Sequence, residues 1–205
     1  VISNAVTKVP KHWDVVPLKR VMEVKDGTHA TPQYVEEAAN TFPLITSKDF
    51  VDTDISFEDA KYIAAADHSE IVRRSNTEVG DVLMSMIGGN IGKALIVETE
   101  RPFSIKNVAL FKARRDISLA KFLLFYLQSG LLDIQIDLIS RGGAQAFLGL
   151  SDLRSLVFFK MPSSEIHSLV EGLELRLAPI DNLARAAEDC LALMRERRAA
   201  LISAA

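Results

Sequence analysis

The C-terminal part of the chain carries an apolar residue at every seventh position. This row comprises Ile166, Leu173, Ile180, Ala187, Met194 and Leu201. Six heptads with an apolar residue at the same position are typical of a coiled-coil helix. The companion row is weaker, because Leu169, Leu183, Cys190 and Ala204 are joined there by Arg176 and Arg197. The predicted seam of this helix consists of Ile166, Leu173, Ile180, Leu183, Ala187, Met194 and Leu201. Since so one-sided a helix is rarely left exposed, it needs a partner.

Pro179 lies inside this row of apolar residues. Proline lacks the backbone N–H that a helix interior requires, so an unbroken helix is not expected across it. The sequence predicts a short helix over about residues 163–177, then a break, and then a second helix over residues 180–203 with Pro179 in its first turn. At 1.5 Å per residue, the second helix would be about 36 Å long.

The residues before this helical region predict one mixed domain. Two apolar runs, residues 81–86 and 93–97, flank a loop with three glycines, which is typical of a hairpin. Further strands are expected over residues 42–46, 105–112 and 153–159, and helices over residues 119–127 and 131–139. Pro43 favours a sheet edge or a strand start for the first of these strands. Because strands and helices do not alternate regularly, the predicted fold class is α+β, with a long C-terminal coiled-coil-type helix.

Composition and motifs exclude several classes of protein. The longest apolar run, residues 122–127, is far shorter than the roughly 20 residues that cross a bilayer, and no signal peptide is visible. We therefore expect a cytoplasmic protein with no membrane partner. A single cysteine, Cys190, excludes an internal disulfide and a cysteine-rich zinc site. Without a phosphate-binding loop or a nucleophile motif, the sequence predicts no catalytic residues, no metal and no cofactor.

Two short motifs have a chemical and a structural interpretation. Residues 88–92 are rich in glycine, but they join two strands, whereas phosphate-binding loops of this kind open a helix. They are therefore interpreted as a turn or as backbone that lies close to a large ligand. His29 follows the turn at Asp26 and Gly27, but no carboxylate or cysteine at a fixed spacing makes it a general base. The chain is predicted to bind rather than to catalyse.

Charge is distributed unevenly along the chain. The pI of about 5.8 argues weakly against a general nucleic-acid binder. Residues 93–141, however, carry eight Lys and Arg against five Asp and Glu, so a local basic face is compatible with the sequence. Five carboxylates between Asp49 and Asp59 lack the pattern of a calcium loop and are interpreted as a solvated face.

Several short stretches, in a fixed order, carry a resemblance to a known family. They are residues 13–18, 26–32, 42–46, 80–85, 89–93, 108–111 and 143–148, then Pro162 with Glu165, and finally residues 193–202. With this ordered set the chain resembles, over nearly its whole length, the specificity (S) subunit of type I restriction-modification systems. It departs from the family at Glu165-Ile166, where the family often has Glu-Gln.

The resemblance implies an architecture and a set of partners. Such subunits have two target recognition domains, each followed by a helix, and each domain reads one half of a split DNA site. The helices pack antiparallel and hold the methyltransferase (M) subunits, and the complete complex adds the restriction (R) subunits. This chain would hold one target recognition domain, residues 1–162, and one helical spacer or dimerisation region, residues 163–205. It is either half of a longer subunit or a natural half that forms a homodimer.

The main hypothesis is a non-catalytic subunit that binds double-stranded DNA sequence-specifically. Bases would be read by forked or long polar side chains on loops, namely Lys48, Asn90, Asn107, Arg141 and Gln145. Lys93 and Lys106 are predicted to contact phosphates, and Thr28, His29, Thr46 and Ser85 are weaker candidates on the same loops. The alternative is a helical scaffold that assembles a complex without reading DNA. The DNA sequence recognised cannot be deduced from the chain.

Overall fold

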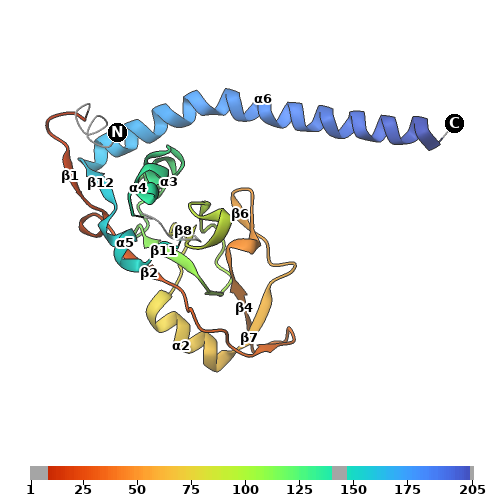
Figure 1. Ribbon diagram of the computed structural model, residues 1–205, viewed down its shortest axis with the longest axis horizontal. Coiled ribbons are helices and arrows are strands. Elements are labelled where there is room, and N and C mark those ends of the chain that lie inside the picture. The colour runs from red at the N-terminus through yellow and green to blue at the C-terminus, as the bar shows by residue number, and fades with distance from the viewer. Residues whose placement is uncertain (1–8, 140–146, 204–205) are drawn as a thin grey trace. The chain divides into compact units, whose positions relative to one another are not determined.

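The computed structural model describes residues 9–139 and 147–203, with the exception of the Asn90 side chain. Contacts divide the chain into two compact units, Val1–Ser163 and Ser164–Ala205. The first unit mixes strands with short helices, and the second is a long helix, α6 (Figure 1). The predicted α+β class with a long C-terminal helix is therefore confirmed.

The predicted central hairpin forms one side of a four-stranded antiparallel sheet, with its second strand at the edge. The strand order is β2 (Glu23–Asp26), β11 (Val108–Lys112), β8 (Val82–Ser85) and β9 (Ala94–Ile96). In the hairpin, Leu83 of β8 pairs with Leu95 of β9, and the glycine-rich segment between the strands contains the short helix η3 (Gly88–Asn90). All four residues of β8 are buried, because β8 has a partner on each side and α3 packs against it.

A second four-stranded sheet contains the strand with Pro43. Its order is β10 (Ser104–Ile105), β4 (Thr41–Ile45), β7 (Lys61–Ala64) and β3 (Tyr34–Val35). The predicted edge position of β4 is wrong, since β4 lies between β10 and β7. Proline is tolerated because β10 pairs only with Leu44 and Ile45, so at Pro43 the strand has a partner on one side only.

The strand predicted over residues 105–112 is two strands in two different sheets. Asn107 adopts a left-handed backbone conformation, with φ of 53°, which asparagine tolerates better than most residues. The chain therefore turns at Lys106 and Asn107, and this turn connects β10 of one sheet to β11 of the other. A core cluster that includes Ile45, Leu83 and Ile105 joins the two sheets.

The remaining elements complete the first unit. They are β1 (Asp14–Pro17), which pairs with β12 (Val157–Lys160), β5 (Phe50–Val51), which pairs with β6 (Asp54–Ile55), the helices α2 (Ala65–Ser75), α3 (Ile117–Gln128), α4 (Leu131–Ile139) and α5 (Leu150–Ser155), and the short helices η1 (Leu18–Arg20) and η2 (Ser47–Asp49). The helices predicted over residues 119–127 and 131–139 are confirmed as α3 and α4. The strand predicted over residues 153–159 is partly wrong, because α5 occupies its first residues; Asp152 accepts a hydrogen bond from the Gly149 backbone at 3.1 Å and helps to start this helix.

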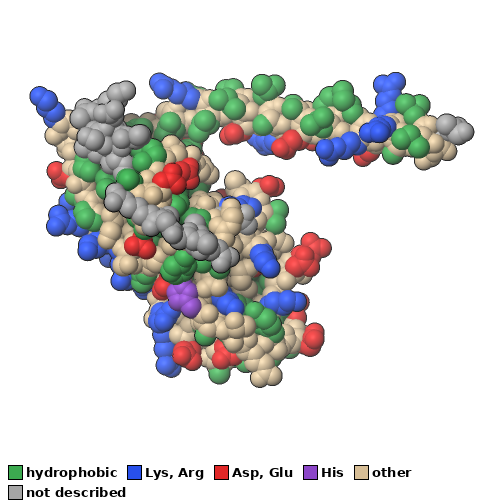
Figure 2. Space-filling view, viewed as in Figure 1, with side chains coloured by type: hydrophobic (Ala, Val, Ile, Leu, Met, Phe, Trp, Pro, Cys, Tyr) green, Lys and Arg blue, Asp and Glu red, His purple; other side chains and the backbone are tan. Residues whose placement is uncertain are grey.

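The break predicted at Pro179 is also wrong, because α6 (Ser163–Ser203) continues through it for 41 residues. The missing N–H of Pro179 leaves the carbonyl of Leu175 without its helical donor. Both residues are exposed, so solvent can hydrate that carbonyl, and the cost is lower than in a buried helix. At 1.5 Å per residue, α6 is about 60 Å long. Apolar side chains are exposed at intervals along it (Figure 2).

Within the described residues, no one helix combines the length and the apolar content of a membrane span. The pair α3 and α4, bent by 62° at the break between them, satisfies these criteria only when the two helices are taken together.

Candidate nucleic-acid interface

Backbone contacts hold the loop after β2 against the turn between β10 and β11. Gly27 donates to the Val108 carbonyl at 2.9 Å, and Thr28 donates to the Ile105 carbonyl at 3.0 Å. Asn107 donates in return to the Thr28 carbonyl at 3.1 Å. A Cβ on Gly27 would lie 2.2 Å from the Ile105 carbonyl oxygen, so only glycine permits this approach. The loop and the turn therefore present their side chains from a common backbone frame.

A capped turn after β4 brings a third segment to the same place. Thr46 donates through its hydroxyl to Asp49 at 2.9 Å and through its backbone to the same carboxylate oxygen at 2.7 Å. The Thr46 hydroxyl also accepts from the backbone of Lys48, so η2 begins with a capping box. Lys106 ties this segment to the β10–β11 turn, because its backbone donates to the Ile45 carbonyl at 2.9 Å.

The capped turn after β4 and the turn between β10 and β11 line a shared cavity of about 380 Å³, which we call the loop cavity. It is lined by Tyr34, Leu44, Thr46, Ser47, Lys48, Asp49, Asp59, Lys61, Ile87, Lys106 and Asn107. Four of the predicted DNA-contacting residues, Thr46, Lys48, Lys106 and Asn107, thus come together. Three lysines line the loop cavity against two carboxylates, and that of Asp49 already accepts hydrogen bonds from Thr46. Its polar groups are therefore suited to a ligand with phosphates and hydrogen-bonding edges.

His29 lies beside this cavity and is held by two side chains. Its Nδ1 is 2.9 Å from Oδ1 of Asn107, and its Nε2 is 2.9 Å from Oδ2 of Asp26. The hydrogen bond to Asn107, followed by that to Asp26, raises the pKa of His29 above its ordinary value. Arg74 of α2 lies nearby, 3.8 Å from the Asp26 carboxylate, and donates to the Gly27 carbonyl at 3.2 Å. A positive imidazolium is therefore favoured at this edge of the interface.

The structure places the other predicted residues differently. Ser85 is fully buried in β8, and its hydroxyl donates to the Ile87 carbonyl at 3.3 Å. It is therefore not part of the candidate interface. Lys93 donates from Nζ to the Phe50 carbonyl at 2.7 Å, whereas Nζ of Lys106 reaches the Thr31 hydroxyl. The side chain of Asn90, and Arg141 and Gln145 entirely, lie outside the described residues.

Sequence reasoning missed several side chains that the fold brings to this region. Tyr34 and Lys61, from neighbouring strands, line the loop cavity, and Arg74 approaches from α2. Phe147 is about half exposed, and its ring lies edge-on to His29 at 6.3 Å between centroids. An aromatic residue just after a glycine-rich stretch was the signal available in the sequence for Phe147; Tyr34 and Lys61 carried none.

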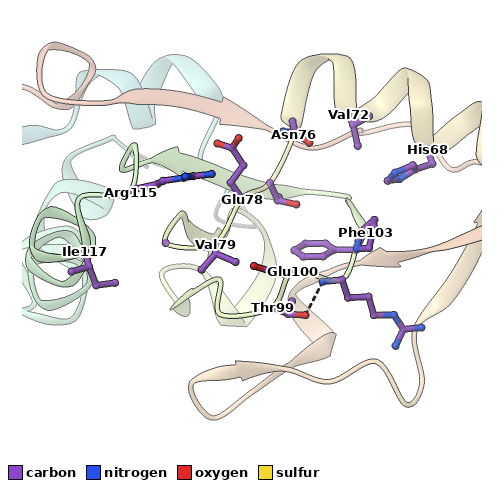
Figure 3. Close-up of a pocket in the computed structure, with 14 residues that line it drawn as sticks. His68, Val72, Asn76, Glu78, Val79, Thr99, Glu100, Phe103, Arg115 and Ile117 are labelled. Atoms are coloured by element: carbon purple, nitrogen blue, oxygen red, sulfur yellow. Dashed lines mark hydrogen bonds between the residues drawn. The ribbon is translucent and has the colours of Figure 1, made fainter.

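A larger cavity, of about 660 Å³, lies elsewhere in the first unit (Figure 3). His68, Glu78, Glu100 and Arg115 are among its charged or titratable lining residues, and none of the predicted DNA-contacting residues lines it. Burial lowers the pKa of His68, which stacks on Phe42. The described part of the chain contains no group of three or more His, Cys, Asp or Glu residues arranged to hold a metal ion.

Comparison with solved structures identifies the fold. The chain is similar to a subunit in a structure of the type I restriction-modification system, with a TM-score of 0.65 and 20% identity over 87% of this chain. It is equally similar in fold to the HsdS subunit from Thermoanaerobacter tengcongensis, with a TM-score of 0.65 and 18% identity over 87% of this chain. The S subunit from M. genitalium matches with a TM-score of 0.51 and 16% identity over 84% of this chain. The fold is therefore that of type I specificity subunits, as the sequence resemblance implied.

The chain spans about two fifths of the length of these relatives, covering 42%, 41% and 41% of them, respectively. No protein-family model matches the sequence, and no curated protein matches it significantly.

Proposed function

We propose that the chain is a sequence-specific DNA-recognition module of a type I restriction-modification system, and that it reads one half of a split target site. The observation that supports this proposal is the loop cavity, where the capped turn after β4 and the turn between β10 and β11 bring lysines, an asparagine and hydroxyl groups together. The fold, shared with specificity subunits, favours the same function.

Within this proposal the side chains divide by chemistry. Lys48 and Asn107 read base edges, because both line the loop cavity and offer hydrogen bonds there. Lys106 contacts phosphate, as a point charge that fixes position without reading sequence. Arg141, Gln145 and Asn90 remain predicted base-reading residues. Thr28, His29 and Thr46 are weaker candidates for DNA contact, and hydrogen bonds to neighbouring side chains hold His29 and Thr46 in place.

The proposed partners follow from the same role. Residues 1–162 act as the target recognition domain, and residues 163–205 act as the helical spacer that engages the methyltransferase subunit and, through the complex, the restriction subunit. The chain itself contributes no catalytic group. Because such a complex acts on the DNA of its own cell, the proposal includes a cytoplasmic location.

The test begins with selection of the preferred site from randomised duplexes by the purified chain. Binding of the selected duplex and of a scrambled duplex is then measured by fluorescence anisotropy at two salt concentrations. A DNA reader should prefer the selected duplex and show a steep salt dependence, because it releases counterions from phosphates. A chain that shows neither is instead the helical assembly scaffold that the exposed apolar row of α6 favours.

The absence of catalysis is tested separately. Incubation of the purified chain with DNA and labelled S-adenosylmethionine should leave the DNA unlabelled. Incorporation of label, in preparations shown to be free of contaminating methyltransferase, would contradict a purely recognitive role.

A further inference from the structure

The imidazole of His29 lies between two side chains that differ in their capacity to donate and accept hydrogen bonds. The Asp26 carboxylate, 2.9 Å from Nε2, can only accept, so Nε2 must carry a hydrogen. The Asn107 side chain, 2.9 Å from Nδ1, has both an oxygen that accepts and a nitrogen that donates. The state of Nδ1 therefore decides which end of the Asn107 amide faces His29.

The two protonation states of His29 require opposite orientations of that amide. When Nδ1 carries a hydrogen, it donates to Oδ1 of Asn107, which is the arrangement in the structure. The amide nitrogen of Asn107 then faces away, and no partner for it occurs among the described residues. When Nδ1 is deprotonated it accepts, so Asn107 must turn its amide by half a rotation and donate to it. Oδ1 then faces outward in place of the amide nitrogen.

We propose that His29 is a positioning residue that sets the hydrogen-bonding polarity of Asn107 toward DNA. This inference rests on the proposed DNA-recognition function, since Asn107 lines the loop cavity. With His29 protonated, Asn107 presents a donor and favours guanine O6 or N7, adenine N7, or thymine O4. With His29 neutral, Asn107 presents an acceptor and favours the amino groups of cytosine or adenine.

The charges around His29 set the pH at which this change occurs. Asp26 on β2 favours the imidazolium, Arg74 on α2 opposes it, and Lys106 next to Asn107 is a further nearby cation. The hydrogen bonds to Asn107 and Asp26 outweigh burial, so the pKa of His29 lies above its ordinary value of 6.5. The orientation of Asn107 therefore changes at a pH above 6.5.

The orientation can be tested without DNA by NMR of the full chain labelled with ¹⁵N. The side-chain amide signals of Asn107 should move with pH along the same titration curve as the His29 ring nitrogens. Asp26→Asn should move both curves together to lower pH, because it removes the charge that favours the imidazolium. His68→Gln removes another partly buried histidine and should change neither curve. Asn107 signals that do not follow His29 would overturn the proposed coupling.

The consequence for DNA is tested with duplexes that vary one base pair at a time in the selected site. Between pH values well below and well above the His29 titration midpoint found by NMR, the preference at one position should change by about tenfold, from guanine or thymine toward cytosine. Asn107→Asp can only accept and should favour cytosine or adenine at both pH values, and His29→Ala should remove the pH dependence. If the NMR result holds and the chain binds DNA with an unchanged preference, the role in readout is overturned. If the chain does not bind DNA at all, the proposed function and the inferred role in readout are both wrong. The coupling between His29 and Asn107 is then judged by the NMR result alone.

Discussion

Two lysines to which the sequence gives the same role, Lys93 and Lys106, have different partners in the folded chain. Lys93 donates to the backbone carbonyl of Phe50 at the start of β5. Lys106 lines the loop cavity, and among the described residues its ammonium group reaches only the hydroxyl of Thr31, a group that a phosphate oxygen could replace. The first contact stabilises the fold, and the second leaves the ammonium group accessible to a ligand.

These partners predict different outcomes for two substitutions. Lys106→Ala should weaken binding to every duplex by a similar factor and reduce the slope of log affinity against log salt by about one, because one phosphate contact is lost. Lys93→Met keeps the aliphatic stem, and should lower the free energy of unfolding by about 1 kcal/mol without changing that slope. Anisotropy titrations and urea unfolding measure the two effects. An equal loss of salt slope in both variants would mean that Lys93 also contacts phosphate.

Gly27 provides a second prediction at the scale of one residue. Gly27→Ala should lower the free energy of unfolding by at least about 2 kcal/mol, because the new Cβ would meet the Ile105 carbonyl at 2.2 Å and separate the loop from the turn. Gly89→Ala is the matched control, since nothing lies within 4 Å of its added Cβ. Urea denaturation followed by circular dichroism measures both. A similar stability in the two variants would show that the loop can move away without cost.

At the scale of single residues, the sequence indicates which polar residues lie on loops, but it does not indicate which groups surround them in the fold. Lys48, Lys106 and Asn107 were predicted from polar chemistry on loops, and the fold gathers them. Ser85 looked equivalent to them, but it is buried in β8, where it pairs with Val108 of β11, a strand that lies far from it in the chain. The contact between His29 and Asn107 spans 78 residues, so no local pattern could reveal it.

At the scale of elements, a buried hydrogen-bond network joins α3, α4 and β12. Tyr126 of α3 donates to the Val157 carbonyl and accepts from the Gln135 side chain, and Gln135 accepts from the Val157 backbone at 2.7 Å. Tyr126 and Gln135 are buried, so these polar groups depend on one another rather than on water. Burial raises the pKa of Tyr126 to about 12.

This network predicts a dependence of stability on alkaline pH. The pKa of Tyr126 in the folded chain, about 12, exceeds the ordinary value of 10.0, so the neutral phenol stabilises the fold. Its contribution, about 3 kcal/mol, is complete below pH 10 and is lost as the pH rises through 12. Tyr126→Phe should cost about 1–2 kcal/mol at neutral pH and abolish this alkaline loss. Urea unfolding at several pH values measures it.

Tyr34→Phe is the control for that prediction. Tyr34 is 45% exposed, so its substitution should leave both the stability and the alkaline loss nearly unchanged. An alkaline loss that persists in Tyr126→Phe would assign the effect to other groups.

Element boundaries depended on context that local rules do not include. Helical periodicity predicted α3 and α4, since both carry buried apolar faces. The effect predicted for proline was wrong at two positions. At Pro179 the exposed surface of α6 tolerates a missing hydrogen bond, and at Pro43 a neighbouring strand starts one residue later. The two strands separate at Asn107 because Ile105 before it pairs with β4 of one sheet, whereas Val108 after it pairs with β8 of the other.

At the scale of the whole molecule, the apolar row of α6 remains without a described partner over most of its length. Ile180, Leu183, Met194 and Leu201 are each more than 60% exposed. Exposed apolar surface of this extent is characteristic of an interaction site. A second copy of the chain, packed antiparallel about a twofold axis, would cover the row and place two recognition domains at opposite ends of the seam.

We therefore expect a homodimer at micromolar concentration or above, measured by sedimentation equilibrium. Ile180→Asp with Met194→Asp should give a monomer, because both aspartates would place an unpaired charge in the seam. Asn182→Asp with Ala199→Asp alters net charge equally but lies off the row, and should leave the dimer intact. A wild-type chain that stays monomeric at high concentration would assign the row to a different subunit.

The close approach at Gly27 also bears on how such a protein could be altered. The bonds that anchor the loop run between backbone groups of Gly27, Thr28, Ile105, Asn107 and Val108, so they do not depend on which side chains the loop carries. Side chains at positions 28, 29 and 31 can therefore be exchanged while the frame that holds them is kept. A library randomised at these three positions, with glycine retained at 27, should consist largely of folded proteins that differ in the DNA they prefer. The loop would then serve as an interchangeable part for reprogramming target choice.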